Sequence, residues 1–477
     1  MHANKNILIV SDLGPSSEFA GGLVMIDIIK VLSGQYNIDL ILFNSYPEEY
    51  KFELPADSNV MIFGKPGERL PVTGNRILSE FIGLLFEGSI TRKWLKTSKK
   101  IIQKEIKSEK YVDVFFILQG QFMPRLAAEL DLSTLRVFSQ YWDPLEWHAQ
   151  NYNLSRRTLR KLRAAYIRFE SNSDLNILVP SEGMKEAVAL RSRIEPKCIH
   201  VVYPPAQSLK YQGELPSNIL EVINKKSIFF VYAGGLYAVD AIKVFIEALE
   251  LIDFQINGQE INFLIISSEV DALTVTSPNV ILSKRLSADM VNRILGEADL
   301  SILPYPFDSP ILTQQAFPSK FPTYSKHAKN LLLIAPSESS LMLFAKENNL
   351  CAGAVSTLSK SGIASELLHL FSNRNQADQS VTIQTIYQKY FTHEVFSSQI
   401  RDIFNFQNSE ALIGKPISYV IKPNVETFSR INRFARLIKP FLRFLRRISS
   451  RRNLIRRIIR FMISRRMKSN TRGGGLR

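Results

Sequence analysis

The chain is poor in cysteine, with only Cys198 and Cys351 among its 477 residues. Two cysteines so far apart exclude a disulfide framework and a structural zinc site, and they fit a reducing compartment. No apolar run approaches the roughly 20 residues that a helix needs to cross a bilayer. The first residues lead straight into an apolar segment at 6–10, so we expect no secretory signal and a cytoplasmic location.

Paired acidic motifs are lacking as well. The sequence contains no Asp-x-Asp and no close cluster of His, Cys and carboxylate residues. Such clusters are what a catalytic metal requires. We therefore predict no bound metal and no other cofactor.

Acidic residues are absent from residues 428–477, which hold 17 Lys and Arg. The whole chain has 60 basic and 44 acidic residues, so the remainder carries 43 against 44 and is nearly neutral. In the tail, bulky apolar residues recur at helical spacing opposite arginines. This amphipathic pattern predicts a helix lying in an anionic membrane surface. The predicted contacts include Arg436, Phe441, Arg443, Arg446, Arg447, Arg456 and Arg457.

Two other interpretations of this tail stay open. Its apolar face could dock on the body of the protein instead. Arginines could also bind nucleic acid, but phosphate contact does not require bulky apolar residues at regular spacing, so this is the least favoured.

Apolar strands alternate with helical patterns along most of the chain, which predicts parallel sheets. In the first half, strands are expected at 6–10, 38–43, 60–63, 112–118, 135–138 and 175–179, with helices at 21–32 and 155–171. After the Pro204-Pro205 pair, strands are expected at 228–232, 261–266, 279–282, 300–303 and 331–335, with helices at 239–251, 287–297 and 362–372. One helix over 384–406 is predicted to return toward the first half. The prediction is an α/β fold of two Rossmann-like domains with a C-terminal basic amphipathic helical tail.

Residues 299–336 hold the most informative chemistry. An apolar strand leads through a proline-broken loop into a polar turn with Lys320, then into a helix and another strand. In open α/β sheets, ligands bind where strand carboxyl ends meet helix N-termini, because free N–H groups and the helix dipole favour anions there. Lys320 at such a turn predicts a bound phosphate.

The run Phe317-Pro318-Ser319-Lys320-Phe321-Pro322-Thr323-Tyr324 resembles the donor-binding segment of GT-B glycosyltransferases, in particular the large retaining group called family 4. Gly21-Gly22, the segment 177–184 and the Gly234-Gly235 turn match further family motifs in the expected order, over roughly residues 5–405. The resemblance implies an acceptor-side domain at 1–205, a nucleotide-sugar donor domain at 206–385, a returning helix at 386–406, a linker at 407–427 and the tail at 428–477.

The resemblance also implies an activity. It predicts a hexosyltransferase-type enzyme that moves a sugar from a nucleotide-sugar to a glycan or lipid-linked acceptor in surface polysaccharide biosynthesis, at the inner face of the membrane. The reaction would retain anomeric configuration without a metal. The donor contacts it implies are Gly21, Gly22, Gly234, Gly235, Arg285, Gln315, Ser319, Lys320, Thr323 and Tyr324. Asp143, His148 and Lys320 are the expected catalytic residues.

Several positions depart from the family pattern, four of them where a charged residue is usual. Gly235 and Asp240 stand where members usually have basic residues, and Gln315 and Thr323 stand where they usually have glutamates. Neutral hydrogen bonds are about half as strong as charge-assisted ones. These departures leave open a catalytically inactive relative that binds a glycan or a partner protein. Two local alternatives stay open too, since Gly21-Gly22 could be a plain flexible turn and His148 could lie on a helix surface.

Overall fold

The computed structural model describes residues 5–16, 20–44, 51–55, 58–65, 91–152, 154–172, 174–192, 195–206, 214–224, 226–350, 352–372, 376–405 and 417–420. All of them belong to one compact unit. The basic tail at 428–477 lies outside the described residues, as do the seven residues named there, so its helices and contacts remain predictions. Within the described part, no helix is long and apolar enough to cross a membrane.

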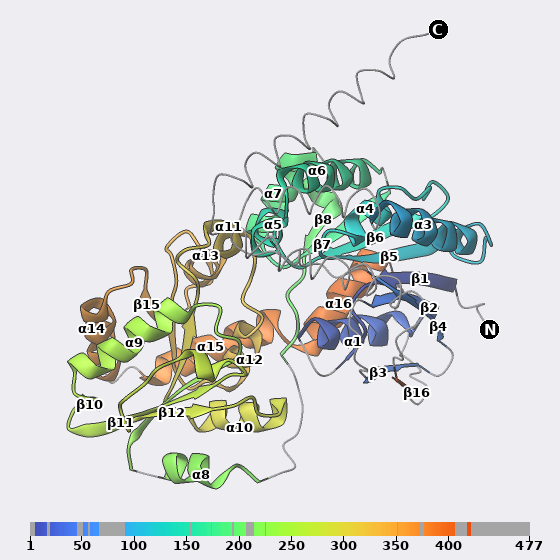
Figure 1. Ribbon diagram of the computed structural model, residues 1–477. Coiled ribbons are helices and arrows are strands. Elements are labelled where there is room, and N and C mark those ends of the chain that lie inside the picture. The colour runs from blue at the N-terminus through green and yellow to red at the C-terminus, as the bar shows by residue number, and fades with distance from the viewer. Residues whose placement is uncertain are drawn as a thin grey trace, which may run out of the picture. The chain divides into compact units, whose positions relative to one another are not determined.

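The first half of the chain forms a parallel sheet with the strand order β4-β2-β1-β5-β6-β7-β8 (Figure 1). Its strands are β1 (Lys5–Ser11), β2 (Tyr36–Asn44), β4 (Asn59–Gly64), β5 (Asp113–Leu118), β6 (Arg136–Tyr141), β7 (Leu175–Val179) and β8 (Ile199–Val201). Its helices are α1 (Ala20–Leu32), α3 (Arg92–Ile106), α4 (Met123–Ala127), α5 (Leu145–Asn151), α6 (Arg156–Glu170) and α7 (Glu182–Ser192). The central strands are buried on both faces, which explains their continuous apolar runs.

The second half forms another sheet in the order β10-β11-β9-β13-β14-β15, with β12 paired to β11. The strands are β9 (Ile228–Ala233), β10 (Gln255–Ile256), β11 (Gln259–Ile266), β12 (Val280–Ser283), β13 (Leu300–Pro304), β14 (Leu331–Ile334) and β15 (Gly353–Val355). Only β10 runs antiparallel to its neighbour. The helices are α8 (Ser217–Asn224), α9 (Val239–Leu251), α10 (Ala288–Glu297), α11 (Pro310–Gln315), α12 (Phe321–His327), α13 (Ser340–Glu347) and α14 (Lys360–Ser372).

Each sheet lies between two layers of helices. In the first half, α3, α4, α6 and α7 share one apolar core with the sheet, while α1 packs in a second core on the other face. In the second half, α9 and α14 pack on one face, and α8, α10, α12 and α13 contribute to the other core. This α/β/α arrangement confirms the predicted two Rossmann-like sheets. A short antiparallel ladder of β3 (Lys51–Leu54) and β16 (Ile417–Val420) stands apart from both.

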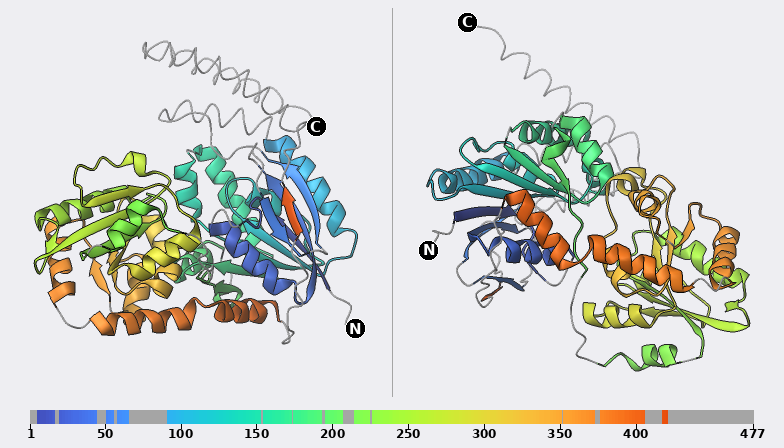
Figure 2. Two further views of the ribbon diagram at one scale, coloured as in Figure 1. Left: turned by 90° about the horizontal axis from the view of Figure 1, so that it is seen from below. Right: turned by 180° about the vertical axis from the view of Figure 1, so that it is seen from behind.

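The predicted helix over 384–406 is wrong in one respect, because two helices occupy it. They are α15 (Gln376–Tyr390) and α16 (His393–Phe404), which Figure 2 draws as separate orange segments. Thr392 ends the run by capping α16, since its side chain accepts a hydrogen bond from the Val395 N–H at 3.2 Å. Phe404 stacks on Phe138 with ring centroids 3.8 Å apart, so α16 reaches the first sheet as expected.

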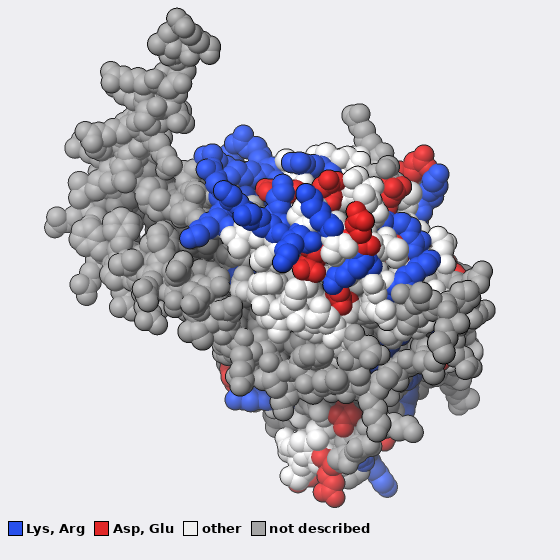
Figure 3. Space-filling view, turned by 90° about the vertical axis from the view of Figure 1, so that its right-hand side faces the viewer, with Lys and Arg blue, Asp and Glu red and all other residues white. Residues whose placement is uncertain are grey.

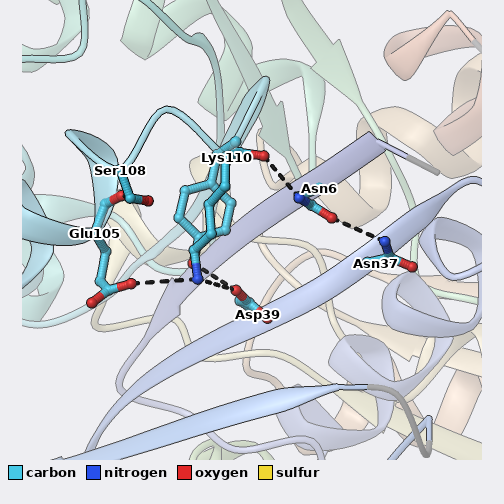
Figure 4. A network of polar contacts seen from close by, with 7 residues as sticks. Asn6, Asn37, Asp39, Glu105, Ser108 and Lys110 are labelled. Atoms are coloured by element: carbon cyan, nitrogen blue, oxygen red, sulfur yellow. Dashed lines mark hydrogen bonds and ion pairs between the residues drawn. The ribbon is translucent and has the colours of Figure 1, made fainter. Parts of the chain in front are cut away.

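Polar contacts fasten the amino-terminal edge of the first sheet (Figure 4). Lys110, in the turn before β5, pairs with Asp39 of β2 at 2.9 Å and with Glu105 of α3 at 3.5 Å. The Asn6 side chain donates to the Lys110 carbonyl and accepts from Asn37, at 2.9 and 3.0 Å. These bonds tie β1, β2, the turn before β5 and helix α3 together at this edge.

Candidate functional site

The carboxyl ends of β9, β12 and β13 lie on one edge of the second sheet, because these strands run parallel within it. Gly234 and Gly235 follow β9, exposed Arg285 follows β12, and Lys320 directly precedes α12. Ligands of open α/β sheets collect at this kind of edge. The structure therefore brings the predicted glycine turn and Lys320 together.

Lys320 makes the central contacts of this edge. Its ammonium donates to the Tyr232 hydroxyl at 2.5 Å and to the Gly235 carbonyl at 3.1 Å. It also lies 4.3 Å from the centroid of the Tyr232 ring and 4.5 Å from that of Tyr237. Aromatic faces attract a cation at these distances. The side chain is thus held in place over the glycine turn before any ligand binds.

Burial lowers the pKa of Lys320 to about 7, because desolvation disfavours its charged form, and the nearby Glu269 carboxylate opposes this shift. At neutral pH the lysine is therefore only partly protonated. A bound anion favours the protonated form and raises the pKa again. Lys320 can consequently gain charge when a phosphate arrives.

The Lys320 side chain passes so close to position 234 that only a glycine fits there. The φ of Gly234 is +135°, in the region that favours glycine, and a Cβ there would lie 2.0 Å from Lys320 Cε. Its N–H is already used, since it donates to the Ile266 carbonyl at 2.8 Å. Gly234 therefore supports Lys320, while a Cβ on exposed Gly235 would meet nothing within 4 Å.

Tyr324 does not fit the predicted contact with a donor. It is 2% exposed, and its hydroxyl accepts from the Ala233 N–H at 2.8 Å and donates to the Ala233 carbonyl at 3.2 Å. These bonds fix α12 against the end of β9. Thr323 is partly exposed and Ser319 exposed on the same turn, so both remain accessible there.

Gln315 lies where the second half of the chain meets α7. The Ser181 side chain donates to the Gln315 carbonyl, and it accepts from the Met184 N–H at 3.0 Å at the start of α7. A Cβ on Gly183 would lie 2.0 Å from the Gln314 carbonyl oxygen. The backbone of Gln315 is thus bound to α7, and its side chain is partly exposed.

Asp143 and His148 lie together in the first half. With Gln119, Gly120, Leu145 and Tyr166 they line one small pocket, which is too tight to hold a water molecule. His148 is 4% exposed and its ring centroid lies 4.1 Å from that of Tyr152, which excludes the surface-histidine alternative. Burial raises the pKa of Asp143, and His148 opposes the shift.

The charge of Asp143 also reaches the second sheet. The pKa of Tyr305, which follows β13, is raised by burial first, and also by the nearby Tyr237 and by Asp143. The Tyr237 and Tyr305 rings are 6.3 Å apart, edge to face. Asp143 therefore acts on Tyr305, whose ring packs against Tyr237, one of the two tyrosines beside Lys320.

Gly22 makes room for the loop that precedes α1. A Cβ there would lie 2.4 Å from the Ser16 carbonyl oxygen and 3.1 Å from that of Gly14. The chain's own loop occupies the space beside the Gly22 Cα, and the predicted donor contact of Gly22 stays a prediction. Its neighbour Gly21 is partly exposed at the start of α1.

Three site residues were missed from the sequence. Tyr232 and Tyr237 enclose the Lys320 ammonium, and Glu269 holds the loop after Gly235 by accepting from the Leu236 N–H at 2.9 Å. The two tyrosines flank the Gly234-Gly235 turn in the sequence, which was an available signal. Among the residues that the structure describes, no three His, Cys, Asp or Glu side chains are grouped so that they could hold a metal ion.

No protein-family model matches the sequence, and no curated protein does. Solved structures do match. The E. coli trehalose-6-phosphate protein bound with UDP-2-fluoro glucose is 10% identical, with a TM-score of 0.57, over 84% of this chain and 100% of its own. Anabaena Alr3699/HepE in complex with UDP is 13% identical, with a TM-score of 0.51, over 84% and 99%.

WaaG, a glycosyltransferase involved in lipopolysaccharide biosynthesis, is similar at 13% identity and a TM-score of 0.52, over 84% of this chain and 100% of its own. Likeness at such low identity concerns the fold. The chain has the GT-B glycosyltransferase fold, with two Rossmann-like domains, as the sequence resemblance predicted.

Proposed function

We propose that this chain is a glycosyltransferase that uses a nucleotide-sugar donor. The observation that carries the proposal is the placement of Lys320 over the Gly234-Gly235 turn, at the carboxyl edge of the second sheet. In addition, two proteins of the same fold have structures with UDP or a UDP-sugar analogue. An aromatic-lined cation at this edge is suited to the diphosphate of such a donor.

Lys320 would act through charge. As the bond between sugar and diphosphate breaks, negative charge grows on the leaving oxygen, and a fixed cation nearby lowers the energy of that state. Because its pKa is about 7 without a ligand, Lys320 would take up a proton when the diphosphate binds. Gly235, exposed and open in front of the turn, leaves room for the phosphate oxygens.

Asp143 and His148 are the proposed contacts to the sugar or acceptor. They line the same pocket in the first half of the chain. The Asp143 carboxylate also contributes to the raised pKa of Tyr305 in the second half. We further propose that the acceptor is a glycan or lipid-linked, in surface polysaccharide biosynthesis. Transfer would retain anomeric configuration without a metal, and the enzyme would work in the cytoplasm at the inner membrane face.

A second candidate is a non-catalytic GT-B relative that binds a glycan or a partner protein. It is favoured by the lack of a basic residue at exposed Gly235 and by the neutral Gln315 and Thr323. Lys320 also already has two hydrogen-bond acceptors within the chain. Both features would weaken donor binding relative to the common family pattern.

A donor panel separates the two candidates. The full chain is incubated with UDP-, GDP-, ADP- and dTDP-sugars, with and without lipid-linked acceptors, and free nucleotide is measured. Transferase function predicts release from one donor that Lys320→Ala reduces at least tenfold. The absence of release from every donor, together with unchanged glycan binding by Lys320→Ala, would support the non-catalytic candidate.

A further inference from the structure

Basic side chains are concentrated on two helices of the first half, away from Lys320. Helix α3 (RKWLKTSKKIIQKEI) has six Lys and Arg against one Glu, and α6 (RRTLRKLRAAYIRFE) has the same balance. The chain outside the tail is nearly neutral, so this is a local excess of positive charge. Figure 3 shows Lys and Arg side chains gathered at the upper left of the described surface.

Helices α3, α4 and α6 enclose a groove of about 560 Å³. Its walls carry six cations and one carboxylate, Glu129. The cations are Arg92, Lys96, Lys99, Arg125, Lys161 and Arg168. Between them, the groove is lined by the small apolar side chains of Leu95, Ala128, Ala164 and Ala165. We refer to these eleven residues as the basic groove.

Three of these cations have no acidic partner among the residues that the structure describes. Within the described part of the chain, no carboxylate lies at ion-pair distance from Lys96, Lys99 or Arg168. Like charges gathered in this way repel one another, and a multivalent anion between them removes that repulsion. The basic groove is thus electrostatically complementary to a compact, highly charged anion.

We propose that the basic groove binds the phosphate of an anionic lipid headgroup. A concave site lined by alanine and leucine takes the apolar glycerol part as well as the charge. Ile167, which is 46% exposed one turn after Ala164 on α6, adds an apolar contact beside it. Nucleic acid is less suitable, because single strands need aromatic stacking platforms and the groove is lined by none.

This inference does not depend on the transferase activity. The groove is built from α3, α6, α4 and the two residues after α4, Ala128 and Glu129, and it contains none of the residues around Lys320. None of its eleven residues belongs to the sequence of the tail at 428–477. A lipid held there would anchor the first half of the chain at a membrane surface.

The test uses the full chain and dihexanoyl phosphatidic acid below its micelle concentration, by calorimetric titration. Lys96→Glu with Arg168→Glu reverses one charge on each wall of the groove. The matched control, Lys100→Glu with Arg157→Glu, makes the same charge change at exposed positions of the same helices outside the groove. The tail is identical in all three proteins, so its contribution cancels.

We expect saturable binding that falls at least about tenfold in the groove variant and stays within about twofold in the control. A photoreactive phosphatidic acid should label 92–99 and 161–168. Equal losses in both variants, labelling of the tail alone, or no saturable binding would overturn the proposal. Tripolyphosphate binding as tightly as the lipid would do so as well, since the ligand would then be soluble phosphate. If the glutamate pair fails to fold, Lys96→Gln with Arg168→Gln replaces it.

Discussion

Single side chains decide how charge is arranged at the candidate donor site. Lys320 has lost part of its charge through burial, and it is held by two tyrosines and one carbonyl. A lysine in this state is preorganised but only partly protonated, so ligand binding and protonation are coupled. This coupling gives the site a measurable pH signature.

Donor binding should take up a proton. The free protein has Lys320 with a pKa of about 7, so most molecules are neutral there at pH 8, whereas a bound diphosphate favours the charged form. Affinity for a nucleoside diphosphate should therefore fall as pH rises from 7 to 9. Calorimetry at pH 8 in buffers of different ionisation enthalpy should give close to one proton taken up.

Lys320→Met is the control for the measurement of proton uptake. It removes the titrating group, so the uptake at pH 8 should disappear while the ionisation of the nucleotide itself is unchanged. Uptake of equal size in Lys320→Met would show that another group titrates, and would remove Lys320 from the binding step.

Gly234 and Gly235 offer a matched pair of substitutions. Gly234→Ala should destabilise the fold by about 1–3 kcal/mol, because its φ is positive and the new Cβ overlaps Lys320. Gly235→Ala meets no neighbour and should change the free energy of unfolding little. Urea denaturation measures both, and equal stabilities for the two variants would contradict the described path of Lys320.

The positions of helices and strands were predicted better than the roles of single residues. Apolar runs such as Ile7–Val10 identified the buried strands, because parallel strands between helical layers are apolar on both faces. The break between α15 and α16 was missed, since nothing in the helical pattern marks Thr392 as a cap. Tyr324 was misassigned because its partner, the Ala233 backbone, lies 91 residues away in sequence.

The predictable part of the site was the part encoded locally. Lys320 and the glycine turn lie in short motifs that identify them. Gly183 was different, because it makes room for the backbone of Gln314, which lies 131 residues later in the sequence. The role of such a glycine could therefore be assigned only from the structure.

The contact between α7 and α11 can be tested with two helical glycines. Gly183→Ala should destabilise the protein by 1 kcal/mol or more, since its Cβ overlaps the Gln314 backbone and neither helix can yield cheaply. Gly296→Ala on α10 meets nothing within 4 Å and should stabilise by about 0.5–1 kcal/mol. Thermal melts that shift in the same direction for both would argue against the described contact.

At the level of the whole chain, charge is divided unevenly. The tail holds 17 basic residues and no acidic one, and the rest is nearly neutral. If the tail binds an anionic membrane, replacing Arg436, Arg443, Arg446, Arg447, Arg456 and Arg457 by Gln should lower recovery in flotation with anionic vesicles. The reason is that each basic residue near such a surface contributes about 1 kcal/mol.

Neutral phosphatidylcholine vesicles provide the control for the tail, since the arginine contribution is absent there. A second control is Phe441→Ser, which removes apolar contact and leaves the charge. If the six-glutamine variant is recovered on anionic vesicles to the same extent as the unaltered protein, an electrostatic membrane anchor is excluded.

The central claim is that the turn at Lys320 holds the diphosphate of a nucleotide-sugar. Calorimetric titration with UDP, GDP, ADP and dTDP tests it most directly, using the unaltered chain, Lys320→Ala and, as a control, Lys329→Ala, which lies before β14 at the opposite edge of the sheet. The account predicts binding of one diphosphate that Lys320→Ala weakens at least about tenfold and Lys329→Ala leaves unchanged. Binding of none of the four, or equal binding by Lys320→Ala, would contradict it.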